Sequence, residues 1–300
     1  MTNNKTLKGV IFVALGATSY GMLATFVKLA YKENFTTAEV TTSQFVLGLL
    51  GILLINLYQK INTKIPAEKP TKKNILQLML AGTSLGMTSV FYYLCVKYID
   101  VSIAIVLLMQ TVWMGVLLEM FLDKKLPSRQ KVTAVILVLI GTILATNLLN
   151  NQNNIDWRGV FWGILAAISF TTTMFTANRI ATNITSAQRS FYMLLGGAII
   201  VFGFSVFAQN RAFNFDIFWK WGIIISLFGT IIPPMLFNIG FPKTGIGLGS
   251  IVASLELPVS VMMAFFILSE QVILMQWIGI LLILFAIIIM NINFKSRKIL

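Results

Sequence analysis

The chain consists of long apolar stretches separated by short polar joins. Each stretch is close to the roughly 20 residues that a helix needs to cross a hydrocarbon core about 30 Å thick. Most charged residues gather in the joins, as in 58–73, 123–131 and 150–158. This pattern predicts an all-α membrane protein with ten transmembrane helices, at residues 9–30, 40–58, 74–96, 100–122, 131–149, 158–178, 188–207, 218–240, 247–268 and 272–293.

The composition agrees with a chain that folds in a lipid bilayer. Of 300 residues, 57% are hydrophobic and 11% are charged, whereas about a quarter of the residues in a soluble domain are charged. The first apolar run is longer than the core of a signal peptide, so we expect it to remain as a helix. Cys95 is the single cysteine, and an intrachain disulfide is therefore excluded.

The net charge of +13 is distributed in a way that indicates membrane orientation. If the N-terminus is cytoplasmic, 17 of the 23 Lys and Arg residues fall on the cytoplasmic side, as the positive-inside rule requires of short loops. We therefore expect a multi-pass protein of the cytoplasmic membrane with both termini cytoplasmic, and no nucleic-acid partner. The six residues on the other side are Lys28, Lys32, Lys97, Arg158, Arg211 and Lys220.

The second half of the sequence repeats the first, which divides the chain into units 1–149 and 150–300. Residues 7–20 align with 157–170, with identities at Gly9/Gly159, Val10/Val160, Leu15/Leu165, Ala17/Ala167 and Ser19/Ser169 and a conservative pair at Tyr20/Phe170. At a shift of 146, further identities follow at Phe91/Phe237, Lys97/Lys243, Leu122/Leu268 and Gln130/Gln276. A unit of five spans is odd, so its second copy enters the membrane from the opposite side. Inverted repeats of this kind are typical of carriers that expose a central site to each side in turn.

Residues 248–283, LGSIVASLELPVSVMMAFFILSEQVILMQWIGILLI, combine a small-residue helix, an acid-x-Pro centre and a turn into the last helix. Glu256, Pro258 and Glu270 occupy the characteristic places. With the first and sixth spans and residues 91–99, this segment resembles the EamA-like ten-helix branch of the drug/metabolite transporter superfamily. The resemblance implies secondary transport of small metabolites, commonly export of amino acids or related compounds. The first half departs from the family pattern at Gln44, Val112 and Lys124.

Glu256 is the acidic residue that the sequence places deepest in a span. It lies about nine residues into its helix, roughly 14 Å deep, where a charged acid costs about 2.5 to 3.5 kcal/mol. We interpret it as a counter-ion for a substrate amine or as a proton-binding group, with a protonated helix-packing acid as the structural alternative. Pro258 removes a backbone donor two residues later and is expected to kink the helix.

Gln110 is the repeat counterpart of Glu256, so the pseudo-symmetry predicts that the two face one another near the membrane centre. Tyr20 and Trp113 are candidate aromatic faces for an organic cation or zwitterion, although aromatic residues in spans more often pack or face lipid. Three small polar residues are candidate hydrogen-bonding groups, with interhelical packing as the alternative. These are Ser19, Ser169 and Asn238.

Other polar and breaking residues have a more structural interpretation. Pro233 and Pro234 are expected to bend or break the eighth span and to provide a hinge. Glu119 lies near the cytoplasmic end of the fourth span, where it can extend to the interface or pair with Lys124 or Lys125. Lys28 and Lys97 are expected to extend to the outer interface.

The leading hypothesis is a carrier for amino acids or related amine or zwitterionic metabolites, with protons as a candidate coupling ion. Alternatives are an uptake carrier for a small organic cation or metabolite, and a non-transporting sensor or assembly protein. An enzyme is disfavoured because the chain has no histidine and one cysteine, which removes His-based proton transfer and Cys–His nucleophiles. We accordingly expect no metal and no cofactor.

Overall fold

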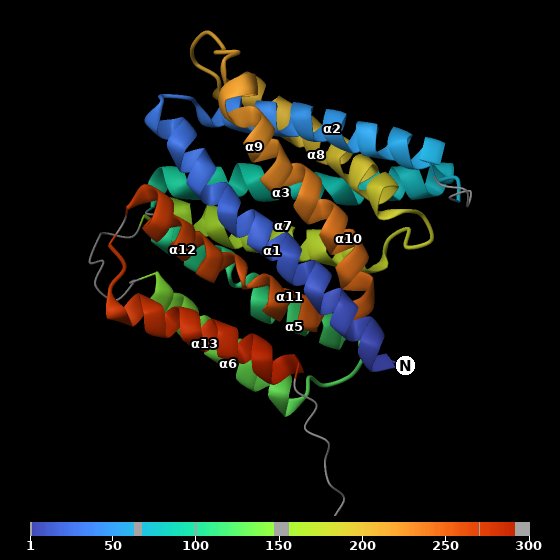
Figure 1. Ribbon diagram of the computed structural model, residues 1–300, viewed down its shortest axis with the longest axis vertical. Helices are drawn as coiled ribbons and strands as arrows, with labels where there is room; N and C mark the ends of the chain where they lie inside the picture. The colour runs from blue at the N-terminus through green and yellow to red at the C-terminus, as the bar shows by residue number, and fades with distance from the viewer. Residues whose placement is uncertain (1, 63–67, 100, 147–155, 270, 292–300) are drawn as a thin grey trace, which may run out of the picture.

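The computed structural model describes residues 2–62, 68–99, 101–146, 156–269 and 271–291, and these residues form helices and no strand (Figure 1). Long helices lie side by side and connect through short turns. In chain order the elements are α1 (Thr2–Lys32), α2 (Thr37–Asn62), α3 (Lys72–Tyr98), α4 (Val101–Leu108), α5 (Thr111–Asp123), α6 (Arg129–Ala145), α7 (Trp157–Arg179), α8 (Ser186–Ala208), η2 (Phe218–Gly222), α9 (Ile223–Ser226), η3 (Leu227–Ile231), α10 (Ile232–Thr244), α11 (Ile246–Ala253), α12 (Glu256–Leu268) and α13 (Leu274–Asn291).

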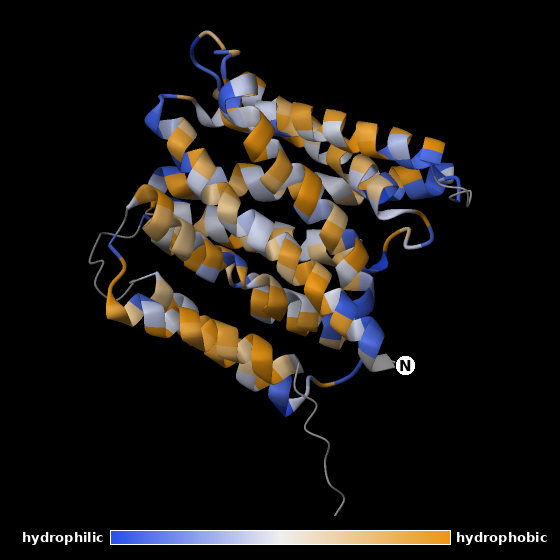
Figure 2. Ribbon diagram, viewed as in Figure 1, coloured by the Kyte–Doolittle hydropathy of each residue, from blue (hydrophilic) through white to orange (hydrophobic). Residues whose placement is uncertain are grey.

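Eight helices of the described residues are long and apolar enough to cross a membrane, and a shorter apolar helix covers Leu274–Met290. Polar residues gather at the helix ends and in the loops, whereas hydrophobic residues predominate along the helices (Figure 2). Large apolar side chains such as Leu54, Phe121 and Phe207 are exposed there, as expected of a surface in contact with lipid. The chain is therefore a multi-pass integral membrane protein.

The predicted count of ten spans depends on α6 and α13, which are the shortest candidates. The predicted fifth span, 131–149, corresponds to α6 (Arg129–Ala145), and its last residues, 147–149, lie outside the described part of the chain. The two helices pack against each other along one side of the molecule (Figure 1). The number ten stays a prediction.

The two repeats begin their second helices with the same local device. Thr36 and Glu39 exchange hydrogen bonds of 2.7 and 3.1 Å between side chains and backbone N–H groups at the start of α2. Thr185 and Gln188 do the same at 3.2 Å at the start of α8. Each pair is a capping box, which satisfies N–H groups that the first helical turn leaves without partners.

Equivalent residues of the two repeats also make equivalent contacts, as an inverted arrangement requires. Gln130, at the start of α6, donates to the carbonyl of Ile289 near the end of α13 at 3.1 Å. Its repeat counterpart Gln276, at the start of α13, donates to the carbonyl of Ala145 at the end of α6 at 3.0 Å. The helices are therefore antiparallel, and an approximate two-fold axis relates the two bonds.

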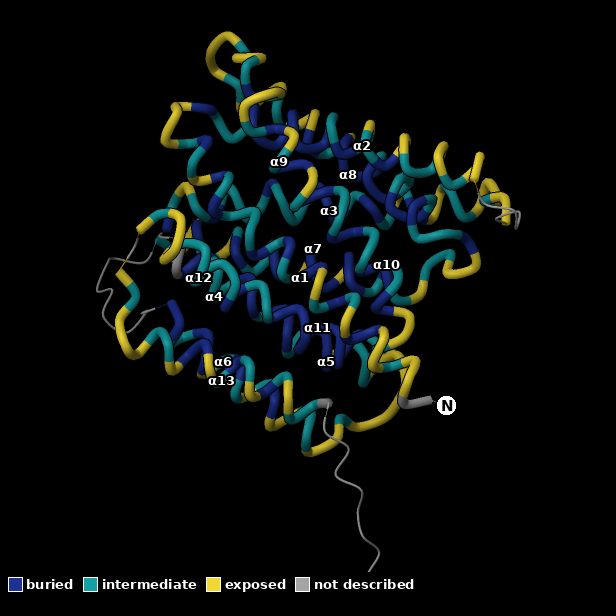
Figure 3. Tube along the Cα trace, viewed as in Figure 1, coloured by how far each residue is buried: buried dark blue, intermediate teal, exposed yellow. Residues whose placement is uncertain are grey.

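The first helix of each repeat packs against the other repeat. Helix α1 contacts α10, α11 and α12, whereas α7 contacts α3, α4 and α5. Buried residues concentrate on these central helices, and the outer helices and loops are more exposed (Figure 3). This exchange ties the two halves into one core.

Glycines allow the closest of these helix contacts. In α3, Gly82 and Gly86 form a G-x-x-x-G pair that lies against the backbone of Met193 and Gly197 in α8. Small residues let helix backbones approach in lipid, where van der Waals packing replaces the hydrophobic effect as the driving force.

Two spans that the sequence predicts as single helices are interrupted in the middle. The fourth breaks between α4 and α5 at Met109 and Gln110, and the ninth breaks between α11 and α12 at Ser254 and Leu255. The breaks correspond closely under the 146-residue shift of the repeat. In the ninth span the chain tightens through hydrogen bonds from residues 254, 255 and 257 to carbonyls three positions earlier. The break thus precedes Pro258, which sits in the first turn of α12, where its missing N–H is tolerated.

The eighth span contains the break that its prolines predict, in the form of wider helical turns. The π-helical segment η3 precedes Pro233 and Pro234, which occupy the first turn of α10. Residues with no N–H cannot continue the normal hydrogen-bond ladder, and single π-turns are a usual accommodation inside α-helices.

Substitution of Gly86 by alanine tests the α3–α8 contact. Its methyl group would lie 2.9 Å from the Cα of Gly197, so we expect a loss of about 1–3 kcal/mol from overpacking and a lower melting temperature in detergent. The control is Gly203→Ala in α8, which meets nothing within 4 Å and should leave the melting temperature unchanged or slightly higher. Equal melting temperatures for both variants would contradict the proposed role of this contact.

Candidate functional site

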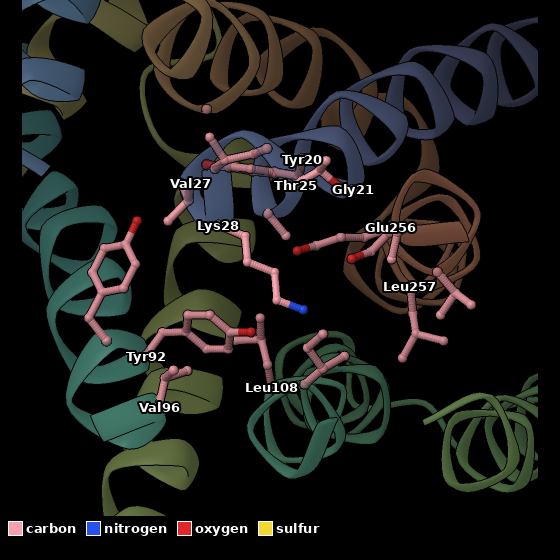
Figure 4. Close-up of a pocket in the computed structure, with 18 of the residues that line it drawn as sticks. Tyr20, Gly21, Thr25, Val27, Lys28, Tyr92, Val96, Leu108, Glu256 and Leu257 are labelled. Atoms are coloured by element: carbon pink, nitrogen blue, oxygen red, sulfur yellow. The ribbon is translucent and has the colours of Figure 1, made fainter. Parts of the chain in front are cut away.

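A cavity of about 310 Å³ lies between the two repeats. Helix α1 lines it along one stripe, with α3 and α4 from the first repeat and α12 from the second (Figure 4). The stripes follow helical periodicity, as expected for faces that share one cavity. The polar lining residues are Tyr20, Thr25, Lys28, Tyr31, Gln44, Thr88, Ser89, Tyr92, Tyr93, Thr146, Thr230, Glu256, Ser260, Gln271 and Gln276.

The cavity reaches the surface at one end of the molecule. Its lining runs along α1 from Tyr20 to Tyr31, along α3 from Leu85 to Val96 and along α12 from Glu256 to Leu268. The C-terminal ends of these three helices lie on the side of the molecule opposite the N-terminus (Figure 1). Lys28 and Gln271 are exposed at this end.

Glu256 contributes the carboxylate of the cavity. It is the first residue of α12, directly after the break in the ninth span, and its carboxylate projects into the cavity (Figure 4). Gly21 of α1 lies against its backbone, where an added Cβ would be 2.5 Å from the Glu256 carbonyl oxygen. The break and this close contact together position the acid in the interior, and the N-terminal end of a helix favours a negative charge.

An aromatic floor closes the inner part of the cavity. The Tyr20 ring packs against Phe170 with centroids 6.1 Å apart and edge-to-face geometry, and against Phe237 at 5.7 Å. Tyr20 and Phe170 are counterparts in the sequence repeat, so their contact lies close to the approximate two-fold axis. Below them the buried core continues through residues such as Phe241.

Helices α5 and α11, one half of each broken span, close the end of the molecule opposite the mouth of the cavity. Helix α5 packs directly on α11, where Gly115 faces Ser250 and the Ser250 hydroxyl donates to the carbonyl of Val112 at 3.2 Å. At the end of α5, Glu119 forms an ion pair with Lys131 of α6. The outer halves, α4 and α12, instead both line the cavity.

The carboxylate of Glu119 also lies against the turn that connects α10 to α11. Added Cβ atoms at Gly245 and Gly247 would lie 2.5 and 2.6 Å from its two oxygens. Glu119 therefore joins the first repeat to the second at the closed end, with Lys131 as its partner in place of the neighbouring lysines that the sequence pointed to.

Gln110 and Trp113 do not meet Glu256 in the cavity. The indole N–H of Trp113 donates to the side-chain oxygen of Gln110 at 2.8 Å, and the Gln110 amide donates to the carbonyl of Val106 at 2.9 Å. Neither residue is among the described residues that line the cavity. Both partners lie within four residues of Gln110, where helical geometry places neighbours, so the Gln110 side chain bonds locally.

Ser19 lies outside the cavity and supports the π-helical segment of the eighth span. Its hydroxyl donates to the carbonyl of Phe228 at 3.0 Å. The N–H of Ile232 bonds to Leu227, and the next residue, Pro233, has no N–H to offer. Ser19 therefore replaces the donor that the proline removes.

Ser169 and Asn238 are also buried away from the cavity lining. The Ser169 carbonyl accepts a hydrogen bond from the Thr173 hydroxyl at 3.2 Å within α7. The Asn238 amide donates to the Ser190 hydroxyl of α8 at 2.9 Å. The Asn238 contact matches the interhelical alternative, whereas the Ser169 contact lies within α7 and involves the backbone carbonyl.

The cavity contains residues that the sequence interpretation did not include. Lys28 lines it near its mouth, where the residue is also exposed, and Gln44, Tyr92 and Tyr93 contribute polar groups from α2 and α3. The available signal was helical spacing, because Lys28 follows Tyr20 by eight residues, slightly more than two turns.

The described residues offer no group of three or more His, Cys, Asp or Glu that could hold a metal ion. Glu270, the acidic residue in the turn that leads into the last helix, lies outside the described residues. The described residues that line the cavity thus provide one carboxylate, one amine and many hydroxyl and amide groups.

Two repeats of membrane helices around a shared cavity define a polytopic membrane protein with the architecture of a transporter. Residues 7–147 and 157–292 each match the EamA-like transporter family. The chain belongs to this family, within the drug/metabolite transporter superfamily, which confirms the resemblance seen in the sequence. Members of the family are transporters rather than enzymes.

One solved structure, described as a crystal structure of a protein, shares the fold with a TM-score of 0.75. The alignment covers 95% of this chain and 97% of the other, at 14% identity, so the likeness concerns the fold alone. Among curated protein sequences, none matches the chain.

Ser19→Ala tests the supporting role of this hydroxyl. Loss of the donor leaves the buried Phe228 carbonyl without a partner, so we expect a destabilisation of about 1–3 kcal/mol, measured as a lower melting temperature. Thr172→Ala is the matched control, because the Thr172 hydroxyl is exposed and bonds only to its own helix. A stable Ser19→Ala protein that has lost solute binding would instead assign Ser19 to the site.

Proposed function

We propose that this protein is a ten-span secondary transporter that exports amino acids or related amine or zwitterionic metabolites by alternating access. The observation that carries the proposal is the cavity between the two repeats, which contains Glu256 at a helix break and reaches the surface at one end. Solute sites of such carriers are formed by interrupted helices near the membrane centre, at the interface of the repeats.

The two broken spans supply the elements that would exchange. In this conformation the halves α5 and α11 pack together, whereas α4 and α12 line the open cavity. Under the repeat, α4 corresponds to α11 and α5 corresponds to α12. In a second conformation, with the roles of the two repeats exchanged, α4 would close on α12 and α5 would separate from α11. This would open the end of the molecule that is closed here.

The proposed orientation follows from the basic residues. We place the protein in the cytoplasmic membrane with both termini in the cytoplasm. Because the open end of the cavity lies opposite the N-terminus, it then faces outward. An exporter releases its solute in this conformation. Protons are the proposed coupling ion, with Glu256 as the group that binds either the proton or the solute amine.

Glu256→Gln tests the proposed site in proteoliposomes loaded with a panel of amino acids and amines. A hydrogen bond to a charged group contributes about 1.5–3 kcal/mol, so we expect flux of the transported solute to fall at least about tenfold. The proton flux recorded by a pH-sensitive dye should fall in parallel. The control is Glu33→Gln, which removes an exposed acid paired with Lys220 and should leave both fluxes intact. Unchanged flux in Glu256→Gln would remove this residue from the mechanism.

Glu119→Gln tests the closed end. The ion pair with Lys131 is partly exposed, and such a pair is worth up to about 1 kcal/mol, so its loss should raise the population open at this end by up to about fivefold. The readout is labelling of Ser250→Cys, in a Cys95→Ala background, by an impermeant thiol reagent added on the N-terminal side. Glu33→Gln again serves as the control, and equal labelling rates would show that Glu119 does not hold this end closed.

A further inference from the structure

Lys28 lies inside the cavity that contains Glu256. Its side chain leaves α1 and extends into the cavity, with the nitrogen directed toward the space between the Glu256 carboxylate, Tyr92 and Leu108 (Figure 4). The residue is exposed at the mouth of the cavity, and its side chain turns toward the interior of the protein (Figure 4).

The charged groups of the cavity are few and opposite. Among the described residues that line it, Glu256 is the one acid and Lys28 is the one base. All other lining residues are apolar or carry neutral hydroxyl, phenol or amide groups. Within the described lining, this pair of opposite charges gives a bound solute two points of charge recognition.

The two charges occupy different levels of the cavity. Gly21 packs on the backbone of Glu256, and Lys28 follows it by seven residues, a rise of about 10 Å along α1. The lysine side chain extends back from this level toward Glu256 (Figure 4). The carboxylate therefore lies at the inner end of the cavity and the ammonium lies nearer to its mouth.

We infer that Lys28 is a specificity-determining residue that binds the carboxylate of a zwitterionic substrate whose amine is held by Glu256. This assignment rests on the proposed transport function and deepens it by naming the end of the substrate that each residue binds. A simple amine would gain the attraction of Glu256 but meet the like charge of Lys28, and a simple carboxylate would meet the reverse. A zwitterion is attracted by both groups.

Three probes that share the same isobutyl group separate these cases. Leucine has both charged groups, isoamylamine lacks the carboxylate and 4-methylpentanoate lacks the amine. Binding to the detergent-purified full-length protein is measured by thermal shift over a concentration series, and flux is measured in proteoliposomes. We expect wild-type protein to bind leucine at least about tenfold more tightly than either single-charge probe.

The variants Lys28→Gln and Lys28→Met should bind leucine about tenfold more weakly and isoamylamine more tightly, so that the preference between the two disappears. Lys28→Arg keeps the charge and should retain the preference for leucine. Lys32→Gln, one turn further along α1 and outside the cavity lining, is the matched control and should behave as wild type. A monodisperse elution profile and an unchanged melting temperature without ligand check folding of each variant.

The outcomes distinguish this assignment from the transport function. If wild-type protein moves leucine and Lys28→Gln keeps the wild-type ratio of leucine to isoamylamine binding, the role of Lys28 is overturned and transport stands. Charge-dependent binding without any flux supports Lys28 and overturns transport. Wild-type protein that binds none of the probes, or binds isoamylamine as tightly as leucine, overturns the assignment.

Discussion

In the hydrocarbon core, each backbone N–H or C=O without a hydrogen-bond partner costs several kcal/mol, and the rest of this structure depends on how that requirement is met. The chain interrupts helices at mid-depth, which is tolerated only where protein surrounds the break. The carbonyl of Phe228 obtains its donor from Ser19 because Pro233 supplies none. Arg189 serves the last turn of α7 in the same way, donating to carbonyls there and to that of Asn238. Such contacts bind the helices around the cavity and leave Glu256 accessible at a break.

The repeat supplies the symmetry that the proposed exchange between two conformations requires. Because α4 and α5 correspond to α11 and α12, contacts that close one end have counterparts that can close the other. The reciprocal bonds of Gln130 and Gln276 hold the antiparallel pair α6 and α13 in this conformation, and the proposed exchange keeps them. By contrast, the Glu119 contact with the turn at Gly245 joins the repeats only at the end that is now closed.

The pattern of long apolar stretches in the sequence predicts much of this fold, because each membrane crossing requires a long apolar helix. The internal repeat is predicted by identities between the two halves of the sequence. The position of Glu256 beside a helix break is predicted by Pro258, two residues later. The break at Met109 and Gln110 could not be predicted, since neither proline nor glycine marks it. The Gln110 side chain bonds to Trp113, three residues away, so symmetry with Glu256 was a misleading guide to it. Lys28 was hidden because a lysine near a helix end usually extends to the interface.

Charge recognition and gating fall on different parts of this architecture. Helix α1 packs against α10, α11 and α12 of the other repeat, so Lys28 and Glu256 belong to the same packed group of helices. The wall opposite them comes from α3 and α4, through residues such as Tyr92 and Leu108. In the proposed exchange, the opposite wall moves while the solute stays between these two charges. Keeping the charged contacts while access changes is what the proposed carrier function requires of this site.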